Sequence, residues 1–421
     1  MQLKARMDVD LVAVEEADEV TVLLDLHAPE EARAGERPPA AVQVVLDRSG
    51  SMHGPRLDAA RRALAALVDR LGPGDRLGVV AFDDEVRVVL PAGPLTDKTA
   101  AKAALLAIES GGQTNLSAGL LRGLQEARRA ATASGAGATL LLLSDGLANV
   151  GETGPDRLGA VAAGARAHGV TISTIGIGLG YDETLLAAIA RGGQGAHAFA
   201  EEGDAAAAAV AGEVEGLLSK TVQAASLLIR PRGEVAGVTV WNDLPAHVVD
   251  GALMADLGDL WSGEQRRLLL TFTVPAMAAL GLAEIATLEL RYVALPGLVE
   301  ETVTLPLYVN VVPGDEAAGR VRDPEVHTEV LFQQAQDAKR RAADALARGD
   351  HDAARHLYER AGAAIAAAPP AMRSDELLGE ADILARFARE TTAGEAAWVA
   401  KRSRMEQAAK ARKRGRRPLD L

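Results

Sequence analysis

The sequence has no cysteine among its 421 residues, and aromatic residues make up only 3% of it. The absence of cysteine excludes disulfides, thiolate metal sites and cysteine nucleophiles, and it is typical of a cytosolic protein. The scarcity of aromatic side chains means that the hydrophobic cores are packed mainly from Ala, Val and Leu. Hydrophobic residues still make up 48% of the chain, which is ample for the cores of two or three domains.

Long uncharged apolar segments are also missing. The longest, LLLTFTVPAMAALGLA at 268–283, has 16 residues and includes Pro275 and Gly281. This is short for a membrane span, so we expect a strand followed by a loop. The N-terminal segment, MQLKARMDVDLVAVEEADEV, carries charges throughout and has no apolar stretch of the signal-peptide type. We therefore expect a soluble, cytoplasmic protein with no membrane span.

What the sequence does contain is a buried strand that ends in a regular polar motif. The segment AAVQVVL at 40–46 has the apolar, branched content of a strand buried on both faces. Asp47, Ser49 and Ser51 follow it at every second position, and a helical pattern begins near Pro55. The three side chains therefore lie in a strand-to-helix loop, at the edge of a parallel α/β sheet where ligands usually bind.

All three side chains of this loop offer oxygen, which suits a hard cation such as Mg²⁺. An isolated D-x-S-x-S motif is more often a helix cap or a turn. Two further segments change that balance. SGGQTNLSAGL at 110–120 carries Thr114 into a helix, and TLLLLSDGLANVG at 139–151 is a second buried strand that ends in Ser144 and Asp145. If these loops share one sheet edge, three hydroxyls and two carboxylates converge there.

This constellation resembles the metal-ion-dependent adhesion site (MIDAS) of von Willebrand factor type A (vWA) domains, including the inserted domains of integrins. The resemblance implies that Ser49, Ser51 and Thr114 bind Mg²⁺, or alternatively Mn²⁺ or Ca²⁺, through their hydroxyls. It also implies that Asp47 and Asp145 contribute carboxylates directly or through water. A protein partner would then present an Asp or Glu carboxylate to the ion. Neutral hydroxyls leave much of the cation's charge uncompensated, so that carboxylate is strongly attracted.

The vWA resemblance covers roughly residues 41–219, where short apolar strands alternate with helical patterns. This alternation predicts a Rossmann-like α/β fold, a parallel-dominated sheet with helices on both faces. Besides the two strands already described, we expect strands at 76–82, 170–178 and 196–201. The expected helices after the first lie at 97–109, 116–131, 182–190 and 204–220.

On both sides of this domain the apolar pattern changes to the alternation of half-buried strands. We predict that residues 1–30 and 220–313 form one β-sandwich, into which the vWA domain is inserted through a linker at 30–40. The arrangement resembles bacterial proteins whose sandwich is similar to that of inter-α-trypsin inhibitor heavy chains.

The C-terminal part is rich in Ala, Glu and Arg and predicts an α-helical region at 320–412, with a turn between two helices at 348–352. Residues 401–417 contain nine Lys or Arg and one Glu, in a chain whose formal net charge is −13. We expect a solvated, partly disordered basic tail there, with 413–421 disordered; contact with nucleic acid, anionic lipid or an acidic surface, including this protein's own, is the alternative. Because no aromatic residues are interleaved, nucleic acid is an unlikely partner.

No catalytic motif accompanies the polar loops. The sequence has no Ser-His-Asp order, no H-E-x-x-H and no phosphate-binding loop, so we expect no enzyme. A Mg²⁺-dependent phosphohydrolase is an alternative, because an exposed metal can polarise a phosphate. Asp47 superficially resembles the nucleophile of haloacid dehalogenase-type enzymes, but Ser49 replaces their second acid. A scaffold with a purely structural ion is a second alternative.

The favoured hypothesis is a cation-dependent protein-binding module or scaffold. The family resemblance implies that intracellular bacterial vWA proteins often work beside AAA+ ATPases or within multicomponent complexes, so an AAA+ ATPase is a candidate partner. In integrin-type domains metal occupancy is coupled to movement of a C-terminal helix. The resemblance implies that its counterpart in this sequence is the segment 204–220, for which an ordinary packed helix is the alternative interpretation.

Overall fold

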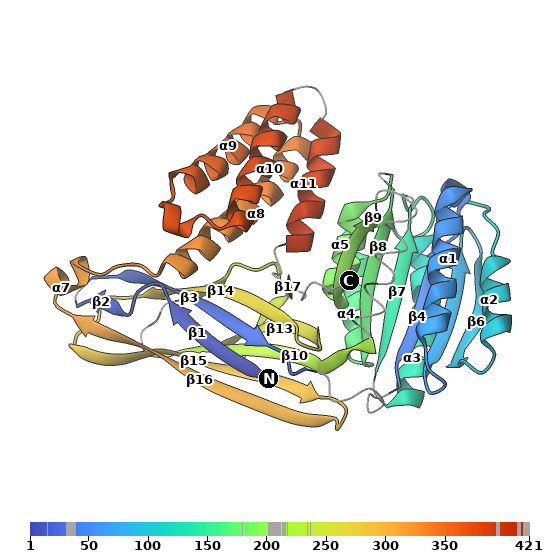
Figure 1. The fold of residues 1–421 in the computed structure, drawn as a ribbon, viewed down its shortest axis with the longest axis horizontal. Helices are drawn as coiled ribbons and strands as arrows, with labels where there is room; N and C mark the ends of the chain where they lie inside the picture. The colour runs from blue at the N-terminus through green and yellow to red at the C-terminus, as the bar shows by residue number, and fades with distance from the viewer. Residues whose placement is uncertain are drawn as a thin grey trace.

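The computed structural model shows an α/β domain, a β-sandwich and a bundle of helices that contacts both (Figure 1). The two flanking segments of the chain meet in the sandwich, on the left in Figure 1, and the α/β domain lies on the right. The structure describes residues 1–14, 16–30, 39–135, 137–145, 147–178, 180–200, 212, 216, 218–233, 235, 237–392, 396–410 and 414–415.

The α/β domain is built on a six-stranded sheet whose order is β6-β5-β4-β7-β8-β9. Five of its strands are parallel, namely β4 (Ala41–Asp47), β5 (Arg76–Phe82), β7 (Ala138–Ser144), β8 (Val170–Ile177) and β9 (Gln194–Ala200). The sixth, β6 (Val86–Pro94), is antiparallel to β5 and was not predicted. Its residues are mostly half-buried or exposed and include Pro91, which is typical of an edge strand.

Helices cover both faces of this sheet, as predicted. On one face α1 (Pro55–Arg70) and α2 (Lys98–Leu106) share a hydrophobic core with the sheet. On the other face α3 (Leu116–Ser134), α4 (Pro155–Arg166) and α5 (Glu183–Gly192) share a second core. The helix α4 was not predicted. Most of the helix expected at 204–220, and of the linker expected at 30–40, lies outside the described residues.

Two sheets form the sandwich. The first has the order β1-β3-β14-β11, with β1 (Gln2–Met7), β3 (Asp18–His27), β11 (Gly237–Val240) and β14 (Gln265–Val274). The second has the order β12-β13-β10-β15-β16-β2, with β2 (Leu11–Ala13), β10 (Lys220–Pro231), β12 (Ala246–Val249), β13 (Ala252–Trp261), β15 (Gly281–Ala294) and β16 (Val299–Val312). One apolar core joins the two sheets, with Leu24 and Leu270 on one side and Leu227 and Leu288 on the other.

The pairing of strands shows how the α/β domain is inserted. Strand β3, before the domain, pairs with β14, after it, over ten residues from Asp18 to His27. Within the range 220–313 expected for the sandwich, the alternating segments 221–229 and 301–312 correspond to β10 and β16. The strands β12 and β13 were not predicted, because β13 interrupts its apolar pattern with the buried acids Asp256 and Asp259. The exact domain boundaries given from the sequence stay predictions.

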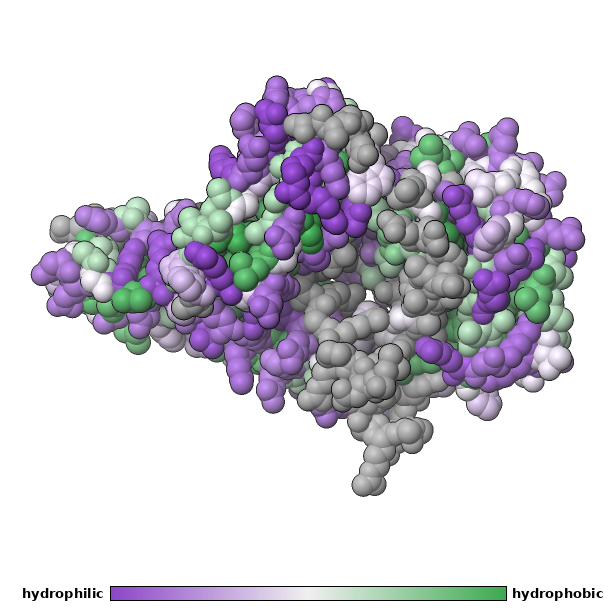
Figure 2. Space-filling view, turned by 45° about the horizontal axis from the view of Figure 1, so that its top comes forward, coloured by the Kyte–Doolittle hydropathy of each residue, from purple (hydrophilic) through white to green (hydrophobic). Residues whose placement is uncertain are grey.

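The C-terminal region consists of α7 (Gly314–Ala318), α8 (Pro324–Ala347), α9 (His351–Ala367), α10 (Asp375–Thr392) and α11 (Ala396–Lys410). The predicted turn separates α8 from α9, and Asp350 caps α9 by accepting a hydrogen bond from the backbone N–H of Ala353. The face of this region in Figure 2 is mostly hydrophilic. No helix among the described residues has both the length and the apolar character needed to cross a membrane.

Residues 401–410 belong to α11, within the helical region expected at 320–412, but they are not solvated throughout as the tail was expected to be. Ser403 of this helix is fully buried and donates a hydrogen bond to the carbonyl oxygen of Lys339. The Lys339 ammonium is itself buried against Glu380, which also pairs with Lys410 at 2.6 Å. Periodicity alone did not reveal these partners, because they come from α8 and α10.

Candidate metal centre

The sheet places the predicted polar side chains at one edge. Asp47 is the last residue of β4, and Asp145 follows directly after β7, the neighbouring parallel strand. Ser49 and Ser51 lie where the chain leaves β4 through the 3₁₀ turn η1 (Gly50–Met52). Thr114 lies in the loop that precedes α3. Parallel strands end at the same edge, which explains why distant segments of the sequence meet here.

Four of the five side chains are joined by hydrogen bonds. The Oδ1 atom of Asp47 accepts a bond from the backbone N–H of Ser49 at 2.8 Å. The hydroxyls of Ser49 and Ser51 lie 3.2 Å apart, and the Ser51 hydroxyl donates to Oδ1 of Asp145 at 2.8 Å. The two carboxylates and the two serines therefore form one continuous polar cluster.

Thr114 is brought to the same edge by backbone contacts. Its N–H donates to Oδ1 of Asn149 at 2.9 Å, and its carbonyl oxygen accepts from the N–H of Asn149 at 3.1 Å. The neighbouring Gly112 accepts a hydrogen bond through its carbonyl oxygen from the N–H of Gly50 at 3.1 Å. Asn149 thus links the Thr114 loop to the loop after β7, and Gly50 links it to the loop after β4.

Burial distinguishes the members of the cluster. Asp47 is completely buried and Asp145 is 1% exposed, whereas Ser51 is exposed. Burial raises the pKa of Asp47 to about 6, although the Ser144 hydroxyl opposes this shift by donating to its Oδ2 at 2.6 Å. The proximity of Asp145 raises the pKa of Asp47 further. A cation beside these two acids would relieve both the desolvation and the repulsion.

Two arginines that the sequence did not single out lie at this edge. Arg56 of α1 donates to Oδ2 of Asp145 at 2.6 Å and to the carbonyl oxygen of Ser51 at 3.3 Å. Arg48 pairs with Asp83, the residue after β5, at 2.9 Å. In the sequence, the only signal for Arg56 is its position directly after Pro55, at the start of α1. Its partner, Asp145, is 89 residues further along the chain.

The donor set fits a hard divalent cation. It combines hydroxyl and carboxylate oxygens, which Mg²⁺, Mn²⁺ and Ca²⁺ prefer, and it contains no thiolate. Among the described residues no group of three or more His, Cys, Asp or Glu could hold a metal. A cation at this edge would therefore depend on Ser49, Ser51 and Thr114 as much as on the two aspartates. That these residues bind a cation stays a prediction.

Residues 42–210 match the family model of the von Willebrand factor type A domain. The chain contains a von Willebrand factor type A domain. The family prediction made from the sequence is thereby confirmed. Domains of this family commonly act as protein-interaction modules.

Proteins and structures similar to the chain extend this result. The chain is 28% identical over 267 residues to an uncharacterized protein of Synechocystis sp., and the match covers 61% of this chain and 62% of that protein. It is 33% identical over 128 residues to inter-alpha-trypsin inhibitor heavy chain H3 of Bos taurus, covering 28% of this chain and 14% of that protein. The chain thus spans less than two thirds of the length of either relative.

The complete fold is shared with a von Willebrand factor type A structure from Catenulispora acidiphila. The two superpose with a TM-score of 0.74 at 20% sequence identity, over 99% of this chain and 97% of the other. The likeness therefore extends beyond the vWA domain to the sandwich and the helices. At this level of identity it concerns the fold alone.

Proposed function

We propose that the chain is a divalent-cation-dependent protein-binding module that captures a carboxylate of its partner through the cluster at the carboxyl ends of β4 and β7. The observation that carries the proposal is the joining of a fully buried Asp47 to Asp145 through the backbone N–H of Ser49 and the hydroxyls of Ser49 and Ser51. Such a cluster offers a cation neutral hydroxyl oxygens beside two carboxylates, and therefore less compensating charge than an all-carboxylate cage. The vWA family supports a role in protein binding.

Each residue has a distinct task in this proposal. Ser49, Ser51 and Thr114 supply hydroxyl oxygens, and Asp47 and Asp145 supply carboxylates directly or through water. The ion itself supplies a positive charge that attracts an Asp or Glu side chain of the partner. Ser51 is exposed, so the cluster can be reached from solvent on its side, whereas Asp47 is shielded.

Mg²⁺ is the proposed physiological ion, because oxygen donors and retained waters suit it. An AAA+ ATPase is the candidate partner that the family resemblance suggests, and it is the first bait to test. A purely structural ion is the competing hypothesis. It predicts that chelation lowers the melting temperature while partner binding is unaffected.

Thr114→Ala tests the proposal, because it removes one hydroxyl and leaves both buried carboxylates in place. We expect the dissociation constant for Mn²⁺, measured by electron paramagnetic resonance, to increase at least about tenfold. Removing a side chain in or beside a metal site commonly weakens metal binding by such a factor. Retention of partner proteins from a cell extract should require Mg²⁺ for the unmodified chain, and EDTA or Thr114→Ala should abolish it.

Ser110→Ala is the matched control. Ser110 lies four residues before Thr114 in the same loop, and its hydroxyl contacts Nδ1 of His53 at 3.0 Å. We expect this variant to bind cation and partner as the unmodified chain does. Equal retention of partners with Mg²⁺ and with EDTA would contradict the proposal and assign partner binding to another part of the molecule.

A further inference from the structure

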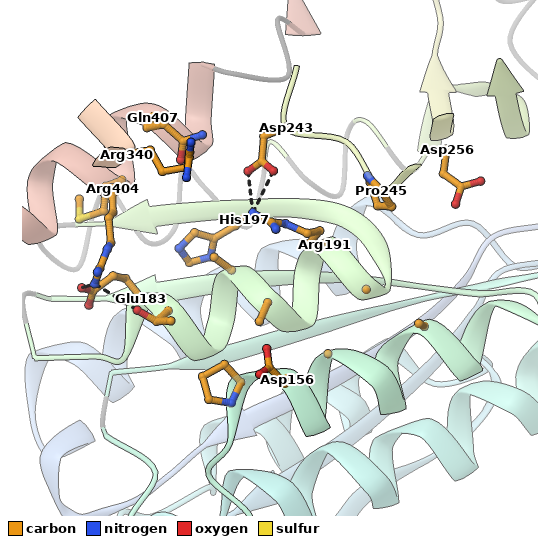
Figure 3. A pocket seen from close by; sticks show the side chains of 18 of the residues that line it. Asp156, Glu183, Arg191, His197, Asp243, Pro245, Asp256, Arg340, Arg404 and Gln407 are labelled. Atoms are coloured by element: carbon orange, nitrogen blue, oxygen red, sulfur yellow. Dashed lines mark hydrogen bonds and ion pairs between the residues drawn. The ribbon is translucent and has the colours of Figure 1, made fainter. Parts of the chain in front are cut away.

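Helix α11 of the C-terminal region contacts α5 and β9 of the vWA domain, and it also contacts the segment between β8 and α5. Lys401 donates a hydrogen bond to the carbonyl oxygen of Tyr181, and its ammonium lies 4.6 Å from the centre of the Tyr181 ring. The same ammonium lies 3.4 Å from Glu183 at the start of α5. Figure 3 shows Arg404, one turn further along α11, also directed at Glu183.

These contacts are largely shielded from water, which increases their strength. The side chains of Lys401 and Glu183 are 15% and 17% exposed, and Tyr181 is completely buried. A cation held over an aromatic ring contributes more when it is desolvated. Tyr181 is itself fixed, because its ring lies so close to Gly176 that a Cβ there would approach it to 2.4 Å. Lys401 therefore binds to a residue of the vWA domain, Tyr181, that is tightly packed in place.

The segment that Lys401 contacts also lies close to the candidate metal centre. A Cβ placed on Gly180, the residue before Tyr181, would lie 3.4 Å from the carbonyl oxygen of Asp145. A Cβ on Gly178 would lie 3.1 Å from the guanidinium of Arg56, which donates to the Asp145 carboxylate. Two short paths thus lead from Tyr181 to Asp145. One ends at the backbone of Asp145 and the other at its side chain.

We infer that Lys401 is a positioning residue for the cation site, which fixes Asp145 through Tyr181 and the β8–α5 connection. The helical region thereby takes part in cation binding although none of its residues belongs to the polar cluster. A partner that displaced α11 would change the affinity for the cation, and the cation would in turn stabilise the docking of α11, because such coupling is reciprocal. The inference rests on the proposed function.

Lys401→Met in the full chain tests it, since Met keeps the length and apolar stem but removes the charge and the donor. We expect the dissociation constant for Mn²⁺ to increase about two- to thirtyfold, the range found for residues coupled through packed contacts. Lys401→Arg should restore the affinity, because a guanidinium can also lie over the Tyr181 ring. Mn²⁺ should slow hydrogen exchange in α11 of the unmodified chain and not in Lys401→Met.

Arg191→Met is the matched control. Arg191 lies on α5, as Glu183 does, and it joins the vWA domain to Asp243 of the sandwich segment at 2.9 Å (Figure 3). We expect its affinity for Mn²⁺ to equal that of the unmodified chain. If Lys401→Met does not yield folded protein, Glu183→Gln carries the same test, because it removes the charge that faces Lys401 from the other side.

The outcomes separate the inference from the proposed function. If the unmodified chain binds no Mn²⁺, both are overturned. If it binds Mn²⁺ and Lys401→Met binds equally well, only the inference is overturned. An equal loss in Lys401→Met and Arg191→Met would also overturn it, since the cause would then be a general loosening of the domain contacts.

Discussion

At the scale of single residues, the buried carboxylate of Asp47 dominates the chemistry of the site. It accepts hydrogen bonds from the Ser49 backbone and the Ser144 hydroxyl, yet burial still raises its pKa to about 6. A carboxylic acid in this environment keeps its proton until the pH exceeds that value or a cation replaces the proton. If the proposed cation binds here, its binding is therefore linked to pH through this one group.

We predict that the stabilisation by Mg²⁺ increases with pH. Between the ordinary value of 3.8 and about 6, Asp47 is protonated in the folded state and ionised in the unfolded state. The cation-free protein thus loses stability from this group as pH increases through that window. The Mg²⁺-induced increase in melting temperature should be small at pH 5 and large at pH 7.5. Asp47→Asn should remove this dependence, and an equal increase at both pH values would contradict it.

Arg56 is the second residue whose role is testable by itself. Its guanidinium lies 2.6 Å from Oδ2 of Asp145, so it competes with a metal ion for the same carboxylate. Charges about 4 Å apart interact by about 1 kcal/mol in water, and the Arg56 side chain is 42% exposed. Arg56→Gln should therefore strengthen Mn²⁺ binding about fivefold. Weaker binding in this variant would show that Arg56 orients Asp145 rather than competing for it.

At the scale of elements, close packing of α3 on the central strand fixes the loops that carry the site. Gly123 of α3 lies so close to β4 that a Cβ there would approach Cγ2 of Val45 to 2.2 Å. Thr114 precedes α3 and Asp47 ends β4, so this contact sets the distance between two of the loops. A glycine in a helix normally weakens it, and here the close approach is the reason for its presence.

Two glycine substitutions should therefore have opposite effects. Gly123→Ala should lower the free energy of unfolding by about 1–3 kcal/mol, because the methyl group overpacks the interface with β4. Gly164→Ala in α4 should raise it by about 0.5–1 kcal/mol, because alanine favours the helix and no atom lies within 4 Å of the added Cβ. Urea unfolding monitored by circular dichroism measures both. Stabilisation by Gly123→Ala would contradict the close approach.

At the scale of the whole molecule, the main hydrophobic cores are separate, although a small apolar cluster of Leu23, Leu269 and Val326 joins the sandwich to α8. The vWA domain has one core on each face of its sheet, the sandwich has its own, and the helical region has a fourth. The contacts between these parts include ion pairs such as Arg166 with Asp256 at 2.9 Å and Arg404 with Glu183 at 3.4 Å. Polar contacts of this kind couple domains less strongly than a shared apolar core does.

We predict more than one transition in differential scanning calorimetry. Mg²⁺ should raise the transition of the vWA domain most, because a ligand stabilises the unit that binds it. Thr114→Ala should remove this increase and leave the other transitions unchanged. A single transition with equal calorimetric and van't Hoff enthalpies, moving as a whole with Mg²⁺, would show instead that the parts unfold together.

The sequence determined the elements that have a strong local pattern. The buried runs of β4, β7 and β8, the helical spacing of α1 and α3, and the alternation in β16 all predicted their structures. The order of Asp47, Ser49, Ser51, Thr114 and Asp145 predicted the candidate site, because hydroxyl and carboxylate types at strand ends are visible in a linear motif. Composition and motif therefore sufficed for the family and for the proposed ligands.

Only the tertiary structure decided which distant groups meet. β13 escaped prediction because its buried acids find partners in other segments, Asp256 with Arg166 and Asp259 with Lys220. The start of the basic segment is docked and not solvated, since Lys401 reaches Tyr181, 220 residues away. The sequence does not show which charged side chains are paired, because their partners come from distant segments. The packing of whole elements places the two charges side by side.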